Sequence, residues 1–327
     1  MQWNGRRVLV TGAGGFIGSH LAERLVEKGA VVRSLVHYNA LGARGWLDRS
    51  PLVGEMEVVS GDIVDRDSVT RALNAVETVF HLASLIAIPY SYEAPDSYMR
   101  VNIGGILNVL QVARECGVER IVHTSTSEVY GTARSCPISE EHPLQAQSPY
   151  SASKIGADKV AESFYLSYGL PVVTVRPFNT YGPRQSARAV IPTIVTQCLT
   201  GGVVRLGNLS PTRDLNFVAD TVEGFVLAGE AEGAVGRTIN LGSGRETSIG
   251  DLAALIGTLC GAEPRIETEE RRARVTGSEV ARLLADATVA REILGWQSRV
   301  SLEQGLERTV AWFREHLVHY RPDDYVL

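Results

Sequence analysis

The stretch Val8-Leu9-Val10-Thr11-Gly12-Ala13-Gly14-Gly15-Phe16-Ile17-Gly18 joins a short β-branched run to a helical pattern through a glycine-rich turn. Gly12, Gly15 and Gly18 have the spacing of a loop whose backbone lets a pyrophosphate approach the amino terminus of a helix, because glycine has no Cβ atom. A glycine triplet by itself also occurs in tight turns, so its meaning depends on the chain around it. The stretch predicts a dinucleotide site at the first strand-to-helix turn.

Beyond this turn, short β-branched runs alternate with helical patterns. The predicted strands cover residues 7–10, 31–36, 57–60, 78–81, 120–123 and 172–176. The helices predicted between them cover residues 16–28, 67–74, 98–115 and 151–168. Such alternation is typical of βαβ units, which build a parallel sheet with helices on both faces. The sequence therefore predicts an α/β fold with a doubly wound parallel sheet of the Rossmann type.

The pattern loosens after residue 176, where prolines and glycines predict a smaller lobe of loops and short elements. A helix over 221–230 and a strand over 237–241 are expected to return to the large domain, and further helices are expected over 252–259, 278–284, 288–294 and 302–317. We therefore predict a dinucleotide-binding domain over 1–180 and about 215–245. The substrate lobe, mostly C-terminal, takes up 181–214 and 246–327.

Composition excludes several classes of protein. The chain has 327 residues, is 44% hydrophobic and carries a net charge of −5, which argues against a surface for nucleic acid or anionic membranes. Its four cysteines are widely separated, so neither a metal site nor a disulfide framework is expected. Neither a signal peptide nor an apolar run long enough to span a membrane is recognisable, and we predict a cytoplasmic protein without a membrane partner.

The end of the second predicted strand bears on which dinucleotide binds. An acidic residue normally accepts hydrogen bonds from the adenosine ribose there and favours NAD, but this chain has Val36 at that position. The local polar candidates are Arg33, His37 and Asn39. We expect NAD, because no arginine pair follows the strand, and NADP is not excluded. Asp62, with Ile63, follows the third strand and either contacts the adenine or simply forms a turn.

A second informative region combines Ser125-Thr126-Ser127-Glu128-Val129-Tyr130-Gly131 with Tyr150-Ser151-Ala152-Ser153-Lys154. Residues four apart share a helix face, so the Lys154 ammonium can favour the phenolate of Tyr150 and make the tyrosine a base. With eleven tyrosines and three lysines in the chain, chance placement gives only about 0.1 pairs with this spacing. The region predicts chemistry on a carbon that bears a hydroxyl group.

Together these motifs resemble the extended short-chain dehydrogenase/reductase family, in its nucleotide-sugar epimerase/dehydratase branch. The resemblance spans nearly the whole chain. It includes the glycine loop, Asp62-Ile63, His81-Leu82-Ala83-Ser84, Asn102, the two stretches above, Arg176 to Pro183, Arg213-Asp214, Asn240 to Gly244 and Leu294-Gly295-Trp296.

The resemblance implies a role for each matching position. Thr126 would bind the sugar O4, Tyr150 would take its proton, and Lys154 would assist the tyrosine and hold the nicotinamide ribose. The implied cofactor contacts are Gly12, Gly15, Phe16, Ile17, Gly18, His37, Asp62, Ile63, Leu82, Ala83, Ser84, Tyr150 and Lys154. The implied substrate contacts are Ser84, Ile86, Asn179, Arg184, Val190 and Arg213. Asn179 could instead be a turn residue, and Arg213 could simply pair with Asp214.

Glu128 points beyond simple oxidation and reduction. Oxidation at C4 acidifies the C5 proton, and a carboxylate can remove that proton so that the C6 hydroxyl is lost. The glucose 4,6-dehydratases that this chain resembles carry an aspartate beside the glutamate as the acid for water loss, whereas this chain has Ser127. That difference is closer to the GDP-mannose dehydratase pattern and leaves the proton donor open.

Two narrower segments, 81–92 and 184–193, look like bacterial nucleotide-linked N-acetylglucosamine 4,6-dehydratases. We therefore expect a 4,6-dehydratase with Thr126, Ser127, Glu128, Tyr150 and Lys154 as its catalytic residues. Its substrate would be a GDP- or UDP-linked sugar. The apolar residues 85–88, Tyr90 and Tyr92 could line the sugar or pack in the core.

Three other functions stay open. A UDP-glucuronate decarboxylase also begins by oxidising C4 and needs a cation for the C6 carboxylate, for which Arg184 and Arg188 are candidates. A 4-epimerase needs no carboxylate at Glu128, and a non-catalytic dinucleotide-binding regulator would not need Thr126, Tyr150 and Lys154 together. The helices over 98–115 and 151–168 could form a homodimer interface or merely cover the sheet.

Overall fold

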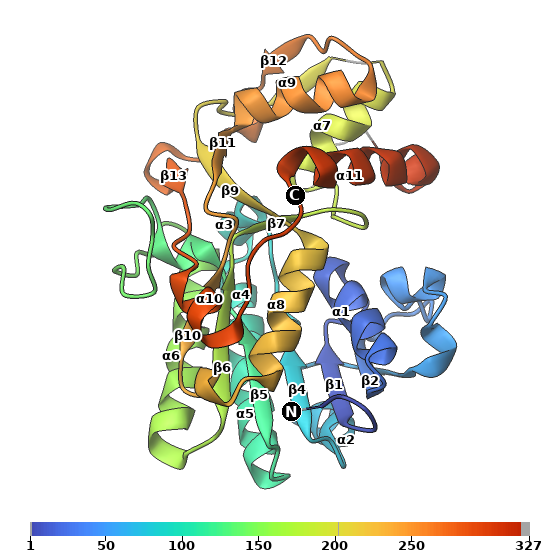
Figure 1. The fold of residues 1–327 in the computed structure, drawn as a ribbon, viewed down its shortest axis with the longest axis vertical. Helices are drawn as coiled ribbons and strands as arrows, with labels where there is room; N and C mark the ends of the chain where they lie inside the picture. Colours follow the sequence, from blue (N-terminus) through green and yellow to red (C-terminus); the bar gives the residue numbers. More distant parts are fainter. Residues whose placement is uncertain (1, 202, 322–327) are drawn as a thin grey trace.

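A seven-stranded parallel sheet forms the centre of the computed structural model, which describes residues 2–201 and 203–321 (Figure 1). Its strands follow the order β10-β6-β5-β4-β1-β2-β3. Their bounds are β1 Arg7–Thr11, β2 Val31–His37, β3 Glu57–Gly61, β4 Thr78–His81, β5 Arg120–Thr124, β6 Val172–Pro177 and β10 Thr238–Leu241. The order reverses between β1 and β4, and a crevice for a ligand opens at such a reversal in doubly wound sheets.

Helices cover both faces of this sheet. On one face α1 (Phe16–Glu27) packs against α8 (Val218–Glu230), and on the other α2 (Arg66–Leu73), α5 (Gly105–Glu115) and α6 (Pro149–Tyr168) pack side by side. The alternation of side chains along β1 explains the two layers, because Val8 and Val10 belong to one buried cluster and Leu9 to the other. The predicted doubly wound α/β fold is confirmed.

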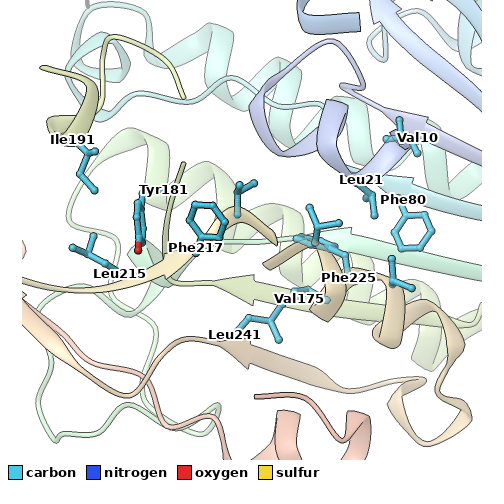
Figure 2. Packing of buried hydrophobic residues seen from close by; sticks show 14 of the residues in the cluster. Val10, Leu21, Phe80, Val175, Tyr181, Ile191, Leu215, Phe217, Phe225 and Leu241 are labelled. Carbon is cyan, nitrogen blue, oxygen red and sulfur yellow. The ribbon is translucent and has the colours of Figure 1, made fainter. Parts of the chain in front are cut away.

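A lobe of smaller elements lies at the carboxyl ends of the strands, drawn at the top of Figure 1. It contains α7 (Val190–Leu199), α9 (Ile249–Cys260) and α11 (Leu302–His316). One small sheet joins β11 (Glu246–Ser248), β9 (Thr212–Phe217), β13 (Arg282–Leu283) and β7 (Asn179–Tyr181), and another pairs β12 (Ile266–Thr268) with β8 (Val204–Leu206). Figure 2 shows that the buried side chains run on from Val10 and Phe80 to Leu215 and Ile191, so one core supports sheet and lobe together.

The division of the chain into a dinucleotide-binding domain and a substrate lobe stays a proposal. Helix α10 (Thr288–Leu294), which the prediction placed in the lobe, packs against α8 and β10 of the large domain. Residues 322–327 of the predicted lobe lie outside the described residues. Among the helices of the described part of the chain, none combines the length and the apolar character needed to cross a lipid bilayer.

Two local predictions were wrong, and a third is confirmed with a change of helix type. Residues 278–284 form no helix; they leave a 3₁₀ turn (Thr276–Ser278) and enter β13, because their backbone groups bond to distant partners such as Thr212 and Ala133. Helix α7 was missed because Pro192 was taken as loop punctuation, although proline is tolerated in the first turn of a helix. The helix predicted over 98–115 is confirmed, and it consists of α4 (Pro95–Tyr98), a π-helical segment (Met99–Gly104) and α5 in succession.

Candidate active site

A cleft of about 1090 Å³ lies between the carboxyl ends of the parallel strands and the lobe. It extends from the glycine loop after β1, past the ends of β4 and β5, to β8 and β9 of the lobe. Its lining includes every predicted site residue except Arg184. These residues are Gly12, Gly15, Phe16, Ile17, Gly18, His37, Asp62, Ile63, Leu82, Ala83, Ser84, Ile86, Thr126, Ser127, Glu128, Tyr150, Lys154, Asn179, Val190 and Arg213.

The glycine loop is built for close approach of a ligand to the backbone. Gly12 has a φ of +71°, a left-handed conformation that favours glycine, and a Cβ atom at Gly18 would lie 2.2 Å from the Gly12 carbonyl oxygen. Helix α1 begins without a side-chain cap, so its first amides are free to bind an anion. The loop therefore fits the pyrophosphate of a dinucleotide.

The end of β2 carries a histidine paired with an acid. His37 Nε2 lies 3.5 Å from Asp62 Oδ2, and both side chains line the cleft. Arg33 is not at this end of the cleft, since its guanidinium bonds to Glu57 and to the carbonyl groups of Ala72 and Asn74. His37 and Asp62 are thus the polar groups placed to meet an adenosine.

The loop after β4 is fixed by two buried polar side chains. Thr11 Oγ1 accepts hydrogen bonds from the backbone N–H groups of Leu82 and Ala83, each at 3.1 Å. Asn102 bonds to both backbone groups of Leu85 and donates to Ser153 on α6. These contacts hold residues 82–85 in the wall of the cleft, between the glycine loop and α6.

The predicted reactive residues meet at the ends of β5 and α6. Thr126 caps a 3₁₀ turn (Ser127–Tyr130) and accepts a hydrogen bond from the Glu128 N–H group at 3.3 Å. Its side chain also faces Tyr150 in the first turn of α6 and lowers the pKa of that phenol. One turn further along, Lys154 is 4% exposed and donates to the Thr124 carbonyl at 2.6 Å. The structure brings these four residues into one wall of the cleft.

The pKa values of Tyr150 and Lys154 differ from the expectation that Lys154 favours a phenolate at Tyr150. Burial raises the pKa of Tyr150, and the side chain of Thr126 offsets only part of that rise. Burial also lowers the pKa of Lys154 to about 8, against the opposing effect of Asp158. The lysine donates to Thr124 rather than to the phenol, so the protein residues alone do not hold Tyr150 as a phenolate.

Glu128 lies at the point where the lobe faces this wall. It is 8% exposed, and its Oε1 lies 3.5 Å from Arg274 Nη1 in the segment before β13. Arg274 was not predicted, because it follows Glu128 by 146 residues in a segment without a recognisable motif. Arg205, Arg272 and Glu279 were also missed, and they line the lobe side of the same cleft.

Arg213 provides a buried cation on β9. It is 6% exposed, burial lowers its pKa, and its nearest carboxylate is Glu279 at 3.5 Å. The alternative pairing with Asp214 is absent, since that carboxylate accepts hydrogen bonds from Ser243, Gly244 and Ala285. Asn179 Oδ1 is buried without a hydrogen-bond partner among the described residues, as expected for a group that meets a ligand.

The prediction that Arg184 lines the substrate site was wrong. Its guanidinium makes two hydrogen bonds of 3.0 Å to Glu23 on α1 and another to Ser19. Arg184 therefore ties the loop after β7 to α1, outside the lining of the cleft. Of the two cations considered for a C6 carboxylate, Arg188 alone lines the cleft.

The sheet order, the glycine loop and the Tyr150/Lys154 pair together define a nucleotide-binding protein of the short-chain dehydrogenase/reductase type. The sequence model of the GDP-mannose 4,6 dehydratase family matches residues 9–309, and the chain belongs to this family.

Three relatives show the range of this similarity. A UDP-glucose 4-epimerase of Mycolicibacterium smegmatis is 37% identical, over 94% of this chain and 98% of the relative. A UDP-N-acetyl-alpha-D-glucosaminuronate decarboxylase of Bacillus cytotoxicus is 34% identical, over 95% and 98%. The structure of DesIV, a dTDP-glucose 4,6-dehydratase of Streptomyces venezuelae with NAD bound, matches with a TM-score of 0.89 at 33% identity, over 97% of this chain and 99% of that one. These names span three reactions, so the site residues must distinguish between them.

Proposed function

We propose that the protein is an NAD-dependent nucleotide-sugar 4,6-dehydratase, a carbon–oxygen lyase that forms a 4-keto-6-deoxy sugar nucleotide. One observation carries the proposal: the buried carboxylate of Glu128 lies in the same wall of the cleft as Thr126, Tyr150 and Lys154. Oxidation at C4 needs a base such as Tyr150, but neither oxidation nor simple epimerisation at C4 needs a carboxylate in addition. Loss of water across C5 and C6 does need one.

Each residue of this wall has its own proposed role in the reaction. Thr126 and Tyr150 bind the C4 hydroxyl, and Tyr150 takes its proton while Lys154 supplies a neighbouring positive charge. The glycine loop with Gly12, Gly15 and Gly18 would hold NAD, which would supply the acceptor for the hydride from C4 and the donor for its return to C6. Glu128 removes the C5 proton, which the C4 ketone has made acidic. The residue beside it, Ser127, is 2% exposed and has no carboxyl group to give a proton to the departing hydroxide.

The substrate end of the cleft supports a nucleoside diphosphate sugar. Arg213 supplies a buried cation for the diphosphate, and a charge-assisted hydrogen bond is stronger in such an enclosed position. Asn179 and Ser84 offer polar contacts, whereas Ile86 and Val190 offer apolar ones. We propose a GDP- or UDP-linked hexose, with N-acetylglucosamine as the sugar that the segments 81–92 and 184–193 favour.

A decarboxylase is the second candidate, and Arg274 is the observation that favours it. Its guanidinium lines the cleft next to Glu128 and could bind a C6 carboxylate. The relative from Bacillus cytotoxicus carries that activity in its name. The dehydratase remains the better reading, since Arg274 already has the Glu128 carboxylate as its partner.

A panel of substrates tests the proposal. Purified protein is incubated with GDP- and UDP-linked glucose, mannose, N-acetylglucosamine and glucuronate, and the products are followed by mass spectrometry and NMR. Loss of one water from a hexose with a new C4 ketone supports the dehydratase. Release of carbon dioxide from the uronate, a stereoisomer of the hexose, or no conversion would each overturn it in favour of the decarboxylase, the epimerase or the regulator.

We also propose a cytoplasmic homodimer formed through α5 and α6. Leu166 and Tyr168 at the end of α6 are 73% and 56% exposed, and Arg114 of α5 stacks on the Tyr168 ring. Exposed apolar side chains on a helix that lies beside α5 suit a two-fold interface. Sedimentation analysis of the wild type and of Leu166→Glu tests this, and a monomeric wild type would contradict it.

A further inference from the structure

A buried carboxylate lies behind the reactive pair on α6. Tyr150, Lys154 and Asp158 follow one another at intervals of four residues, so they share one face of the helix. Asp158 is 4% exposed and accepts four hydrogen bonds from side chains. The donors are His123 Nε2 at 3.1 Å, Ser125 Oγ at 2.7 Å, and Arg176 Nε and Nη2 at 3.1 and 2.9 Å.

Two of these donors connect α6 to the end of β5. His123 and Ser125 flank Thr124, whose carbonyl oxygen accepts the hydrogen bond from Lys154 Nζ at 2.6 Å. Alternate residues of an extended strand point to the same side, so both donors reach the same carboxylate. Thr126 follows Ser125, and its side chain lowers the pKa of Tyr150. Asp158 therefore fixes the helix against the segment that carries the opposite side of the site.

The same carboxylate balances buried charge. Burial alone would raise the pKa of Asp158, but the hydrogen bond from His123 and the charge of Arg176 outweigh it and hold the pKa at about 2. Burial lowers the pKa of His123 and of His81, whose ring stacks on His123, so both are neutral. The buried charges here are thus Asp158, Arg176 and Lys154, with one positive charge in excess.

We infer that Asp158 is a positioning residue for the reaction, which sets the alignment and the charge of the Tyr150/Lys154 pair through α6 and β5. This inference rests on the proposed function, because that function gives Tyr150 and Lys154 their chemical roles. It differs from a purely structural role in one respect. Removing the charge of Asp158 must change how the pair titrates.

The direction of that change follows from the groups that face the pair. These are Asp158 on α6, His81 on β4, His123 on β5, Glu128 in the 3₁₀ turn after β5, and Tyr98 on α4. Arg176 on β6 faces Asp158 itself, and Tyr130 faces Arg176. Without the negative charge of Asp158 an ammonium at Lys154 becomes less favourable and a phenolate at Tyr150 becomes more favourable. Activity plotted against pH should give a bell-shaped profile, whose acid and alkaline limbs report the joint titration of Tyr150 and Lys154. Both limbs should therefore move to lower pH when the charge of Asp158 is removed.

The test compares Asp158→Asn with wild type in the C4 oxidation step, followed from acid to alkaline pH with the nucleotide sugar that the wild type converts. We expect kcat to fall about tenfold to a hundredfold, KM to stay unchanged, and both limbs to move to lower pH. Ser125→Ala is the matched control, because it removes one hydrogen bond to the same carboxylate without changing its charge. It should leave the limbs in place.

The possible outcomes distinguish a failure of the proposed function from a failure of the role of Asp158. A wild type that converts no nucleotide sugar overturns the proposed function and this inference with it. If the wild type is active but Asp158→Asn keeps its pH profile and its kcat, only the role of Asp158 is overturned. A rise in KM at constant kcat in Asp158→Asn overturns that role as well. If Asp158→Asn does not fold, the variant His123→Gln combined with Ser125→Ala keeps the pair with Arg176. A kcat equal to wild type in that double variant overturns the inference, and a tenfold loss at constant KM supports it.

Discussion

Arg274 Nη1 lies 3.5 Å from Glu128 Oε1 and joins the lobe to the wall of the cleft that carries the reactive residues. The two side chains are 23% and 10% exposed, so solvent only partly screens the contact. The arginine reaches the site from the segment before β13, and its carboxylate partner lies two residues after the Thr126 cap. The position of Glu128 thus depends on both parts of the fold.

Arg274→Gln tests how far this contact orients Glu128. A partly exposed ion pair contributes up to about 1 kcal/mol, so we expect water loss to slow by about two- to fivefold while C4 oxidation stays unchanged. The measurement is kcat for each step with the preferred hexose nucleotide, and Arg274→Lys, which keeps the charge, serves as the control. A far larger loss confined to uronate substrates would contradict the account and favour a decarboxylase.

Gly15→Ala should weaken NAD binding without unfolding the protein. A Cβ atom there meets only the Gly12 carbonyl oxygen, at 3.2 Å, but it occupies a position that lines the cleft at the amino terminus of α1. We expect at least a tenfold higher Kd for NAD by calorimetry and a nearly unchanged Tm. Gly18→Ala is the contrasting variant, since its Cβ would lie 2.2 Å from backbone and should lower the Tm. Wild-type affinity in Gly15→Ala would contradict the assignment of this loop.

Lys154→Met should stabilise the protein while abolishing activity. Burial lowers the pKa of Lys154 to about 8 from an ordinary 10.5, so the unfolded chain binds this proton more tightly than the folded protein does. The penalty is fully present below pH 8, and the stability of the wild type should rise between pH 8 and 10.5 as the proton is lost. At pH 7 we expect Lys154→Met to raise the free energy of unfolding by about 1–3 kcal/mol. Denaturant unfolding without nucleotide measures this, and a less stable variant would show that the ammonium is well compensated.

Tyr150→Phe removes the base while keeping the ring in place. We expect the first hydride transfer to fall by about a hundredfold or more, because a positioned base typically contributes that much. Absorbance of the reduced nicotinamide in a single turnover reports the step directly. Tyr90→Phe is the control, since that tyrosine is also near Tyr98 but is 39% exposed and has no assigned role. A fully active Tyr150→Phe would refute the Tyr/Lys interpretation.

Much of this architecture could be predicted from local patterns. Buried parallel strands such as β1 and β4 are short β-branched runs, and the glycine loop and the Tyr150/Lys154 pair sit where strand and helix signals place them. Local patterns failed where distant partners decide the structure. Residues 278–284 form an edge of the lobe because β9 offers them backbone partners.

The same limit applies to the site. Arg184 belongs to a motif near the cleft, yet its side chain is held on α1 by Glu23, a contact that no spacing along the chain predicts. Arg274 and Glu279 carry no motif and reach the site only through the folding of the lobe. The pKa shifts of Tyr150 and Lys154 arise from burial, which depends on every element packed around them.

Isotope exchange in the variant Glu128→Gln tests whether Glu128 is the base that removes the C5 proton. The variant and the wild type are each mixed in deuterated water with the nucleotide sugar that the wild type converts, and NMR follows deuterium at C5. The account predicts that Glu128→Gln still oxidises C4, seen as reduced-nicotinamide absorbance, but takes up no deuterium at C5 and loses no water. Normal dehydration by Glu128→Gln, with deuterium at C5, would contradict it.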